Sequence, residues 1–224
     1  MSVAVVTGAA GALGTAVLDD LTGRGWTVAA LDRPGDRLEA VRRDGVVRVP
    51  VDLLDRASVA AAFEQVDGVG TPTALVALAG GFRSSSLADL DEDLLDAMWS
   101  TNVAALVWCA QAVAPRMASA GGGSIVTVSA RSAVSGAAPV AYGASKAAVV
   151  RATEVLADEL RPQRIRVNCV LPSVIDTPAN RSWMSPDLTA TAVPPSAIAP
   201  VIAFLLGRDS APVSGARIPV YGDA

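Results

Sequence analysis

Short runs of β-branched and apolar residues alternate with longer segments of helical pattern along the whole of this 224-residue chain. The expected strands are apolar on both faces, so each face of their sheet needs cover. Strands separated by helix-length segments pair in parallel, because the crossover returns the chain to the same end of the sheet. The pattern predicts one α/β domain over residues 1–224, a doubly wound parallel sheet of about seven strands with helices on both faces.

The expected elements follow a regular order. Strands are predicted at about 3–8, 26–32, 46–53, 73–81, 124–130, 165–172 and 216–222, and helices at about 12–25, 37–45, 55–66, 91–118, 141–162 and 195–207. The irregular stretch between the last two strands is rich in proline, serine and threonine. Open sheets of this kind bind ligands at the carboxyl ends of their strands, so this stretch is predicted to form a substrate flap near 176–195.

Composition excludes several classes of function. The net charge is −4 and the arginines are scattered, so no nucleic-acid partner is expected. The chain has no histidine and two cysteines, which argues against a metal site and against serine–histidine nucleophiles. Cys109 and Cys169 suit reduced core thiols. No apolar run reaches the roughly 18 to 20 residues of a membrane span, and an apolar run from Val3 leaves no room for a leader, so a cytoplasmic location is expected.

The segment TGAAGALG, residues 7–14, lies between the first expected strand and helix. Gly8, Gly11 and Gly14 allow a tight turn and a close backbone approach, and the helix start behind them offers N–H groups to a pyrophosphate. Glycines at such turns also serve packing alone. Asp32 ends the second strand, where a carboxylate can bond the adenosine ribose diol and repel a 2′-phosphate. NAD(H) is therefore favoured, while Arg33 beside Asp32 leaves NADP(H) possible.

Lys146 is the one lysine in a chain with eighteen lysines and arginines, and it follows Tyr142 by four residues in a helical segment. Their side chains therefore project from the same helix face, one turn apart. A nearby ammonium favours the phenolate and lowers the pKa of a phenol. The pair predicts proton exchange by Tyr142, with Lys146 as its cation; a surface pair without function is the alternative.

These residues, the Thr-Gly turn, TNVAA in the long helix and VNCVLPSVIDTP after the sixth strand together resemble the short-chain dehydrogenase/reductase family over essentially the whole chain. The resemblance implies that Tyr142 is the general acid or base, that Lys146 holds the nicotinamide ribose, and that Asn102 steadies a water on the proton route. It also implies the cofactor-binding set Thr7, Gly8, Gly11, Leu13, Gly14, Asp32, Arg33, Asp52, Leu53, Ala79, Gly80, Tyr142, Lys146, Pro172, Ile175 and Thr177. The family's long helices imply a homodimer or homotetramer.

Two departures from the family pattern stand out. Ala77 and Leu78 replace amides at the end of the fourth strand. Ser129 lies thirteen residues before Tyr142, the family's usual interval for its catalytic serine, but alignment on the strand puts Ala130 at that place. Ser129 is predicted to be catalytic, with Ser132 as a further candidate.

The predicted function is NAD(P)-dependent hydride transfer between nicotinamide and a small carbonyl/alcohol substrate. LPSVIDTPANRSWM and GALG are also similar to the dihydropteridine reductases of the family, which manage without that serine, so an NADH-dependent enzyme of that kind is an alternative. A non-catalytic NAD-binding or scaffold protein is the alternative of another class. Arg181 in the flap is a candidate handle for an anionic or polar substrate group.

Overall fold

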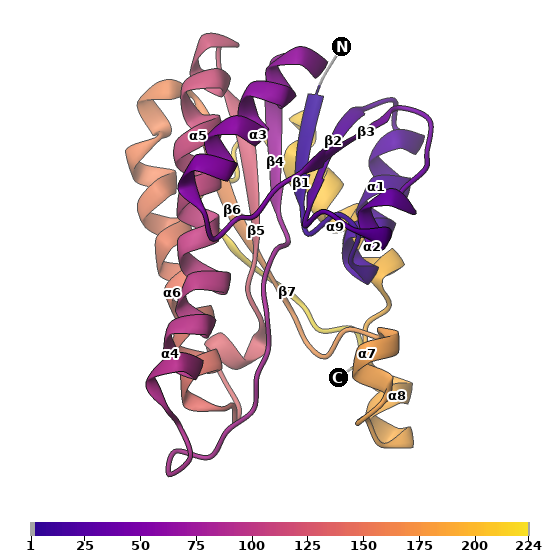
Figure 1. Ribbon diagram of the computed structural model, residues 1–224, viewed down its shortest axis with the longest axis vertical. Helices are drawn as coiled ribbons and strands as arrows, with labels where there is room; N and C mark the ends of the chain where they lie inside the picture. The colour runs from indigo at the N-terminus through magenta and orange to yellow at the C-terminus, as the bar shows by residue number, and fades with distance from the viewer. Residues whose placement is uncertain (1–2, 224) are drawn as a thin grey trace.

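The computed structural model describes residues 3–223, which contain a seven-stranded sheet (Figure 1). Its strand order is β3-β2-β1-β4-β5-β6-β7, and every pair of neighbours is parallel. The strands are β1 (Val3–Thr7), β2 (Thr27–Asp32), β3 (Val46–Pro50), β4 (Pro72–Ala77), β5 (Gly123–Val128), β6 (Ile165–Pro172) and β7 (Arg217–Val220). The predicted doubly wound α/β fold is confirmed.

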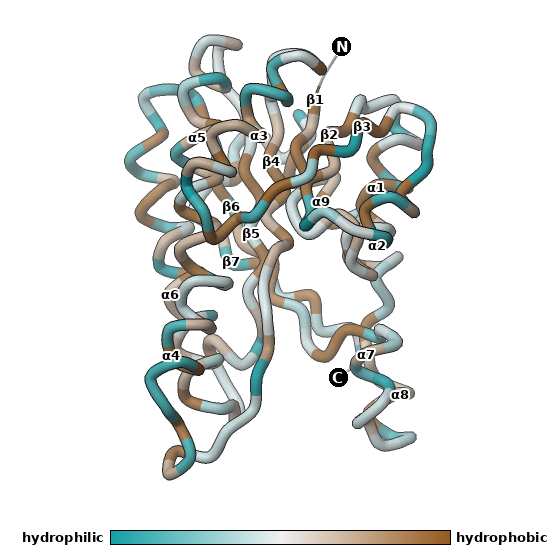
Figure 2. The backbone as a smooth tube through the Cα atoms, viewed as in Figure 1, coloured by the Kyte–Doolittle hydropathy of each residue, from teal (hydrophilic) through white to brown (hydrophobic). Residues whose placement is uncertain are grey.

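Helices connect the strands and cover both faces of the sheet. They are α1 (Ala12–Gly23), α2 (Asp36–Glu39), α3 (Arg56–Val69), α4 (Glu92–Trp99), α5 (Ala105–Ser119), α6 (Val140–Glu159), α7 (Pro178–Arg181), α8 (Pro186–Thr191) and α9 (Pro195–Leu206). Helices α1 and α9 pack on one face, and α3, α5 and α6 pack on the other (Figure 1). The hydropathy colouring shows apolar strands between these two layers (Figure 2).

The alternation of side chains along a strand explains the two layers. In β1, Ala4 and Val6 face the cluster under α1 and α9, while Val5 faces the cluster under α3 and α5. All three side chains are fully buried. Strands apolar on both faces therefore require helices on both sides, as the sequence pattern predicts.

The observed bounds differ most from the predicted ones in three elements. The helix expected at 37–45 is only α2, because Leu38 is its one buried residue and Gly45, with φ +76°, starts the turn into β3. Strand β4 ends at Ala77 rather than at residue 81. The long helix expected at 91–118 is interrupted by a π-helical turn at Ser100–Ala104, between α4 and α5.

The predicted flap contains two short helices, α7 and α8, beyond the end of β6 (Figure 1). The segment that enters the flap and the segment that leaves it meet at an isolated β-bridge between Ile175 and Val193. There Val193 N donates to Val174 O and Asp176 N donates to Val193 O, each at 2.8 Å. These bonds tie both ends of the flap together beside the sheet.

Two further expectations are tested by the fold. Cys109 and Cys169 are free and buried, which confirms them as core thiols. Over residues 3–223, the structure contains no helix with the length and apolar character that a membrane span requires.

Candidate active site

The chain leaves β1 toward β2 on one side and enters β4 on the other, so a crevice opens at the carboxyl ends of these strands. The turn after β1 fills its base. Gly8 has φ +65°, and a Cβ atom there would lie 2.9 Å from Ala79 N. A Cβ atom on Gly14 would lie 2.3 Å from Gly8 O. Glycine at both positions therefore lets α1 and β4 approach the turn closely.

A cavity of about 750 Å³ lies over this turn. Eight of the predicted cofactor residues line it: Gly8, Gly11, Asp32, Arg33, Asp52, Leu53, Ala79 and Gly80. Thr7, Leu13 and Gly14 lie beneath it instead: the Thr7 hydroxyl accepts from Ala79 N at 3.3 Å, and the Leu13 side chain packs in the core. These three residues support the turn rather than wall the cavity.

The Asp32 carboxylate has two backbone partners. Oδ2 accepts from Ala10 N in the glycine turn, and Oδ1 accepts from Arg33 N, both at 2.8 Å. Arg37 donates to the Ala10 carbonyl oxygen at 3.1 Å, so the two peptide groups that flank Ala10 are each held by a side chain. An acidic group and two arginines thus meet at the wall where the adenosine of a dinucleotide would bind.

A second cavity, of about 520 Å³, lies on the other side of Phe82 and is called the substrate cavity below. Tyr142, Ser129, Pro172 and Ile175 line it. Phe82 lines both cavities. Its ring contacts the Tyr142 ring edge to face, with centroids 4.9 Å apart and planes at 81°. Tyr142 therefore stands at the junction of the two cavities.

Lys146 lies beneath this junction, with 8% of its surface exposed. Its Nζ donates to Val128 O at 3.2 Å and lies 6.0 Å from the centre of the Tyr142 ring. A Cβ atom on Gly80 would lie 3.1 Å from Nζ, so Gly80 leaves the ammonium room toward the cofactor cavity. Burial lowers the pKa of Lys146 to about 8.

The pKa of Tyr142 moves in the direction opposite to the predicted one. Burial raises the pKa of the phenol. Lys146 Nζ points to the Val128 carbonyl oxygen rather than to the phenol, so the ammonium does not offset the loss of solvent at the ring. Tyr142 is a protonated phenol at neutral pH in this structure.

Asn102 links three parts of the site from the π-helical turn. Its Oδ1 accepts from Gly81 N at 2.8 Å, and its Nδ2 donates to Gly81 O at 3.1 Å and to Ser145 Oγ at 2.9 Å. The Ser145 hydroxyl donates to Tyr142 O at 2.8 Å. Asn102 thereby joins the loop that carries Phe82 to the helix turn that carries Tyr142.

Ser129 is buried at 4% exposure, and its hydroxyl donates to the Lys146 carbonyl oxygen at 2.7 Å. The hydroxyl thus fastens the end of β5 to helix α6. Ala130 and Ser132 also line the substrate cavity.

The sequence profile of the short chain dehydrogenase family matches residues 2–187. The chain is 31% identical to 2-(R)-hydroxypropyl-CoM dehydrogenase of Xanthobacter autotrophicus, over 98% of this chain and 97% of the relative. It is 33% identical to D-threitol dehydrogenase of Mycolicibacterium smegmatis, over 98% and 91%. A crystal structure of a 3-oxoacyl-[acyl-carrier protein] reductase with bound NAD from Brucella melitensis shares the fold, with a TM-score of 0.90 and 24% identity over 100% of this chain and 91% of that one.

This chain is a short-chain dehydrogenase. The family resemblance seen in the sequence is thereby confirmed, and with it membership of a family of oxidoreductases that use nicotinamide cofactors. The residues present fit such a cofactor. Side chains at Gly8 and Gly14 would collide with Ala79 and with Gly8 O, so the turn keeps its bare backbone toward the cavity, which Asp32 also lines.

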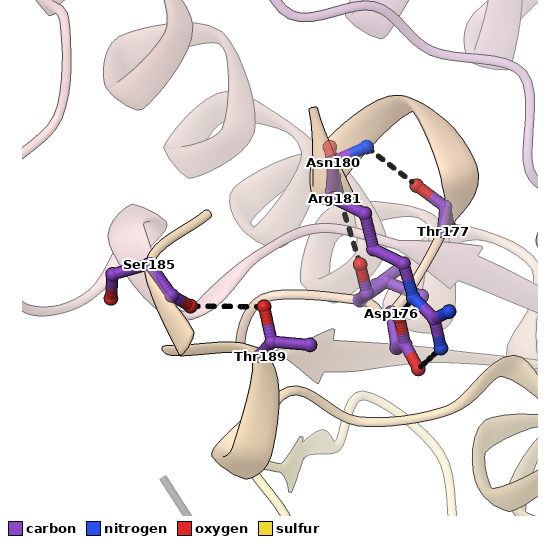
Figure 3. Close-up of polar contacts among 7 residues, drawn as sticks. Asp176, Thr177, Asn180, Arg181, Ser185 and Thr189 are labelled. Atoms are coloured by element: carbon purple, nitrogen blue, oxygen red, sulfur yellow. Dashed lines mark hydrogen bonds and ion pairs between the residues drawn. The ribbon is translucent and has the colours of Figure 1, made fainter. Parts of the chain in front are cut away.

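Two of the residues considered in the flap, Thr177 and Arg181, make contacts within the flap itself (Figure 3). Thr177 caps α7, where its hydroxyl accepts from Asn180 N at 3.1 Å, and it lines neither cavity. Arg181 donates to Asp176 at 2.6 Å, and the guanidinium lowers the pKa of that carboxyl. Arg181 is therefore paired on the outside of the flap and does not line the substrate cavity.

Sequence reasoning missed Phe82, Gly81, Ser145 and Arg37. The pattern YGASK contains Ser145, so its spacing beside Lys146 was a usable signal. Arg37 follows Asp32 by five residues, but only the fold brings it to Ala10. Phe82 carries no signal in the sequence, because its position depends on the clasp between Gly81 and Asn102.

Proposed function

We propose that this short-chain dehydrogenase catalyses hydride transfer between a nicotinamide cofactor and a small carbonyl/alcohol substrate, with Tyr142 as the acid or base. The observation that carries the proposal is the place of Tyr142, one helix turn from buried Lys146 and at the boundary of the two cavities. The relatives named as dehydrogenases support a carbonyl/alcohol pair as the substrate class.

The cofactor would supply or accept the hydride. Residues lining the larger cavity would hold its adenosine half, with the glycine turn toward the pyrophosphate and Asp32 toward the ribose diol. Asp32 favours NAD(H), because its carboxylate repels a 2′-phosphate. Arg33 and Arg37 line the same wall, so NADP(H) is the second choice. Pro172, Ile175 and Thr177 are the proposed contacts at the nicotinamide end.

Tyr142 would donate its proton when a carbonyl is reduced and take one when an alcohol is oxidised. A phenol whose pKa is raised by burial holds its proton at neutral pH, so the proton is present when a carbonyl is reduced. Lys146 would stabilise the phenolate that forms and bond the ribose beside Gly80. Asn102, between the Gly81 loop and Ser145, would hold this arrangement and steady a water on the proton route.

Ser129 supports a second candidate function. Ser129 lines the substrate cavity, but its hydroxyl proton is donated to Lys146 O, and Ala130 follows it, so this proton is not free to polarise a substrate carbonyl. A substrate reduced without a developing alkoxide needs no such group. Reduction of a quinonoid dihydropterin by NADH is the alternative in this class, and non-catalytic NAD binding is the alternative in another.

The family's assembly is also proposed for this chain, as a homodimer or homotetramer. Leu95 and Trp99 of α4 are 45% and 52% exposed, so α4 offers apolar surface for a second copy. Light scattering during size-exclusion chromatography measures the mass in solution, and a monomer at all concentrations would contradict this.

One experiment separates the candidate functions. NADH and NADPH are titrated against the protein by fluorescence, and ketones and quinonoid dihydropterin are then assayed with wild type and Tyr142→Phe. We expect NADH binding in both proteins and ketone turnover in wild type that falls at least ~100-fold in Tyr142→Phe. Binding without turnover of any substrate would favour the scaffold, and turnover of the pterin alone would favour the second candidate.

A further inference from the structure

Aromatic side chains gather at the substrate cavity. The chain has four tryptophans, two tyrosines and three phenylalanines, and Phe82, Tyr142 and Trp183 all line this one cavity. Phe82 is 55% exposed and Trp183 is 56% exposed. Large exposed apolar side chains are common singly, but two at the mouth of one cavity indicate a surface that a ligand covers.

Phe82 is held in place from two sides. Its ring packs edge to face on Tyr142, at 4.9 Å between centroids. The residue before it, Gly81, has both its N–H and its carbonyl oxygen bonded to the buried Asn102 side chain, at 2.8 and 3.1 Å. The exposed part of the Phe82 ring therefore faces the cavities from a fixed position, next to the phenol that exchanges the proton.

Trp183 reaches the same cavity from the flap. Its backbone N–H donates to Asn180 O at 3.1 Å, and the Asn180 side chain donates to Ile175 O at 2.8 Å, so the backbone that carries the indole is tied to the chain that leaves β6. Figure 3 shows Asn180 and the neighbouring Asp176–Arg181 pair. Phe82 and Trp183 thus come from segments about a hundred residues apart and share one cavity.

The remaining lining carries little charge. Arg131 is the one charged residue among those that line the cavity, and its guanidinium lies over the Tyr221 ring, 5.0 Å from the centroid. Val174, Leu188, Ala130 and Pro139 are among the apolar side chains of the wall. The cavity therefore favours an uncharged, apolar ligand near Tyr142.

We propose that the substrate carries its reducible group on a flat, unsaturated ring, and that this ring packs against Phe82 and Trp183. The inference rests on the proposed function, since it names the substrate class of that same site. Aromatic rings pack on one another better than their area alone explains, and each such contact contributes roughly two- to tenfold in affinity. A saturated ring of the same size is puckered and loses these contacts.

Two ketones test this choice. Acetophenone and cyclohexyl methyl ketone carry the same methyl ketone on a six-membered ring, flat in the first and puckered in the second. The quantity measured is the ratio of their kcat/KM values, in wild type, Trp183→Leu and Phe82→Leu. Leucine keeps apolar bulk and removes the aromatic face. Phe204→Leu is the matched control, because Phe204 is 47% exposed on α9 and lines neither cavity.

We expect the acetophenone preference to fall roughly two- to tenfold in Trp183→Leu and in Phe82→Leu, and to remain as in wild type in Phe204→Leu. The ratio cancels the different reactivity of the two ketones, and it cancels any common loss when Phe82→Leu disturbs Tyr142. A ratio that is unchanged in both cavity variants would overturn the inference. Trp183 is exposed, so Trp183→Leu should fold, and its thermal unfolding is compared with wild type.

Binding of the two ketones to the protein with NADH, measured by saturation-transfer NMR, separates this inference from the proposed function. Acetophenone binding that depends on Trp183, without turnover, would support the aromatic site and overturn the proposed reaction. Turnover of both ketones at a ratio that no variant changes would support the reaction and overturn the inference. Absence of both binding and turnover for the two ketones would overturn both.

Discussion

Lys146 Nζ lies 6.0 Å from the centre of the Tyr142 ring and donates its hydrogen bond to Val128 O. The two side chains are neighbours without a direct bond, and burial acts on both: it lowers the pKa of Lys146 to about 8 and raises that of Tyr142. Each group is thereby displaced toward its neutral form. The proposed chemistry needs the ammonium of Lys146 and the phenolate of Tyr142, so burial sets the free-energy cost of forming these two charged groups.

The first prediction concerns the size of the cation. In Lys146→Arg a broad guanidinium replaces an ammonium in a space bounded by Gly80 and the Val128 carbonyl oxygen. We expect NADH affinity to stay within a few-fold of wild type and turnover to fall at least ~100-fold, on the scale of general acid–base effects. Fluorescence titration and steady-state kinetics measure the two quantities. Turnover at the wild-type rate would show that the lysine is incidental.

The second prediction concerns Ser129, whose hydroxyl donates to Lys146 O at 2.7 Å. Removing it in Ser129→Ala leaves a buried carbonyl oxygen without this donor, so we expect the free energy of unfolding to fall by about 1 kcal/mol. Turnover should fall less than about tenfold, because the hydroxyl proton is donated to Lys146 O rather than to the substrate. Urea unfolding and kinetics are run with Ser124→Ala as the matched control, because Ser124 is a buried serine of β5 that donates to Leu205 O at 2.9 Å and lines neither cavity. A turnover loss of ~100-fold with stability unchanged would instead place Ser129 on the substrate.

Tyr142, Lys146 and Ser129 show which parts of the site can be predicted from the sequence. Spacing alone places Tyr142 and Lys146 on one helix face, because a helix fixes what lies four residues apart. The bounds predicted for β6, 165–172, agree with the structure, since a segment rich in β-branched and apolar residues ends there at a proline. Ser129 is correctly placed at the end of β5, but its partner, Lys146 O, is set by the packing of α6 on the sheet.

The parts that the sequence does not predict depend on contacts between distant segments. The sequence predicts Gly80 and Gly81 at the end of the fourth strand, but β4 ends at Ala77. The N–H and the carbonyl oxygen of Gly81 bond to the Asn102 side chain instead of to a neighbouring strand. Phe82 then reaches Tyr142. The sequence predicts Arg181 as a cation available to the substrate, but helix α7 places its guanidinium against Asp176, with which it forms an ion pair.

The third prediction concerns cofactor choice. Asp32→Ala removes the carboxylate that would bond the ribose diol and that repels a 2′-phosphate, while Arg33 and Arg37 stay at the same wall. We expect the ratio of NADPH to NADH dissociation constants to fall at least about tenfold, with weaker NADH binding because Ala10 N also loses its acceptor. Asp36→Ala, at the same cavity, is the control. An unchanged ratio in Asp32→Ala would remove Asp32 from the cofactor site.

The last prediction concerns stability against pH, and its sign follows from Lys146. Burial lowers the pKa of Lys146 from the ordinary 10.5 to about 8, so between these values the unfolded chain holds a proton that the folded protein has released. The free energy of unfolding contributed by this group therefore rises as pH rises through that window, by about 1.4 kcal/mol for each pH unit at most, and is constant below it.

Other buried groups act in the opposite direction and must be subtracted. Burial raises the pKa of Cys109 to about 12, and it also raises those of Cys169 and Tyr142, so the folded protein keeps these protons at alkaline pH and loses stability there. Urea unfolding of wild type and of Lys146→Met at pH 6.5 to 9.5 cancels most of these shared effects. We expect the stability of wild type relative to Lys146→Met to be flat below about pH 7 and to rise above about pH 8. A difference that stays flat to pH 9.5, or that falls, would show that the folded protein keeps Lys146 charged.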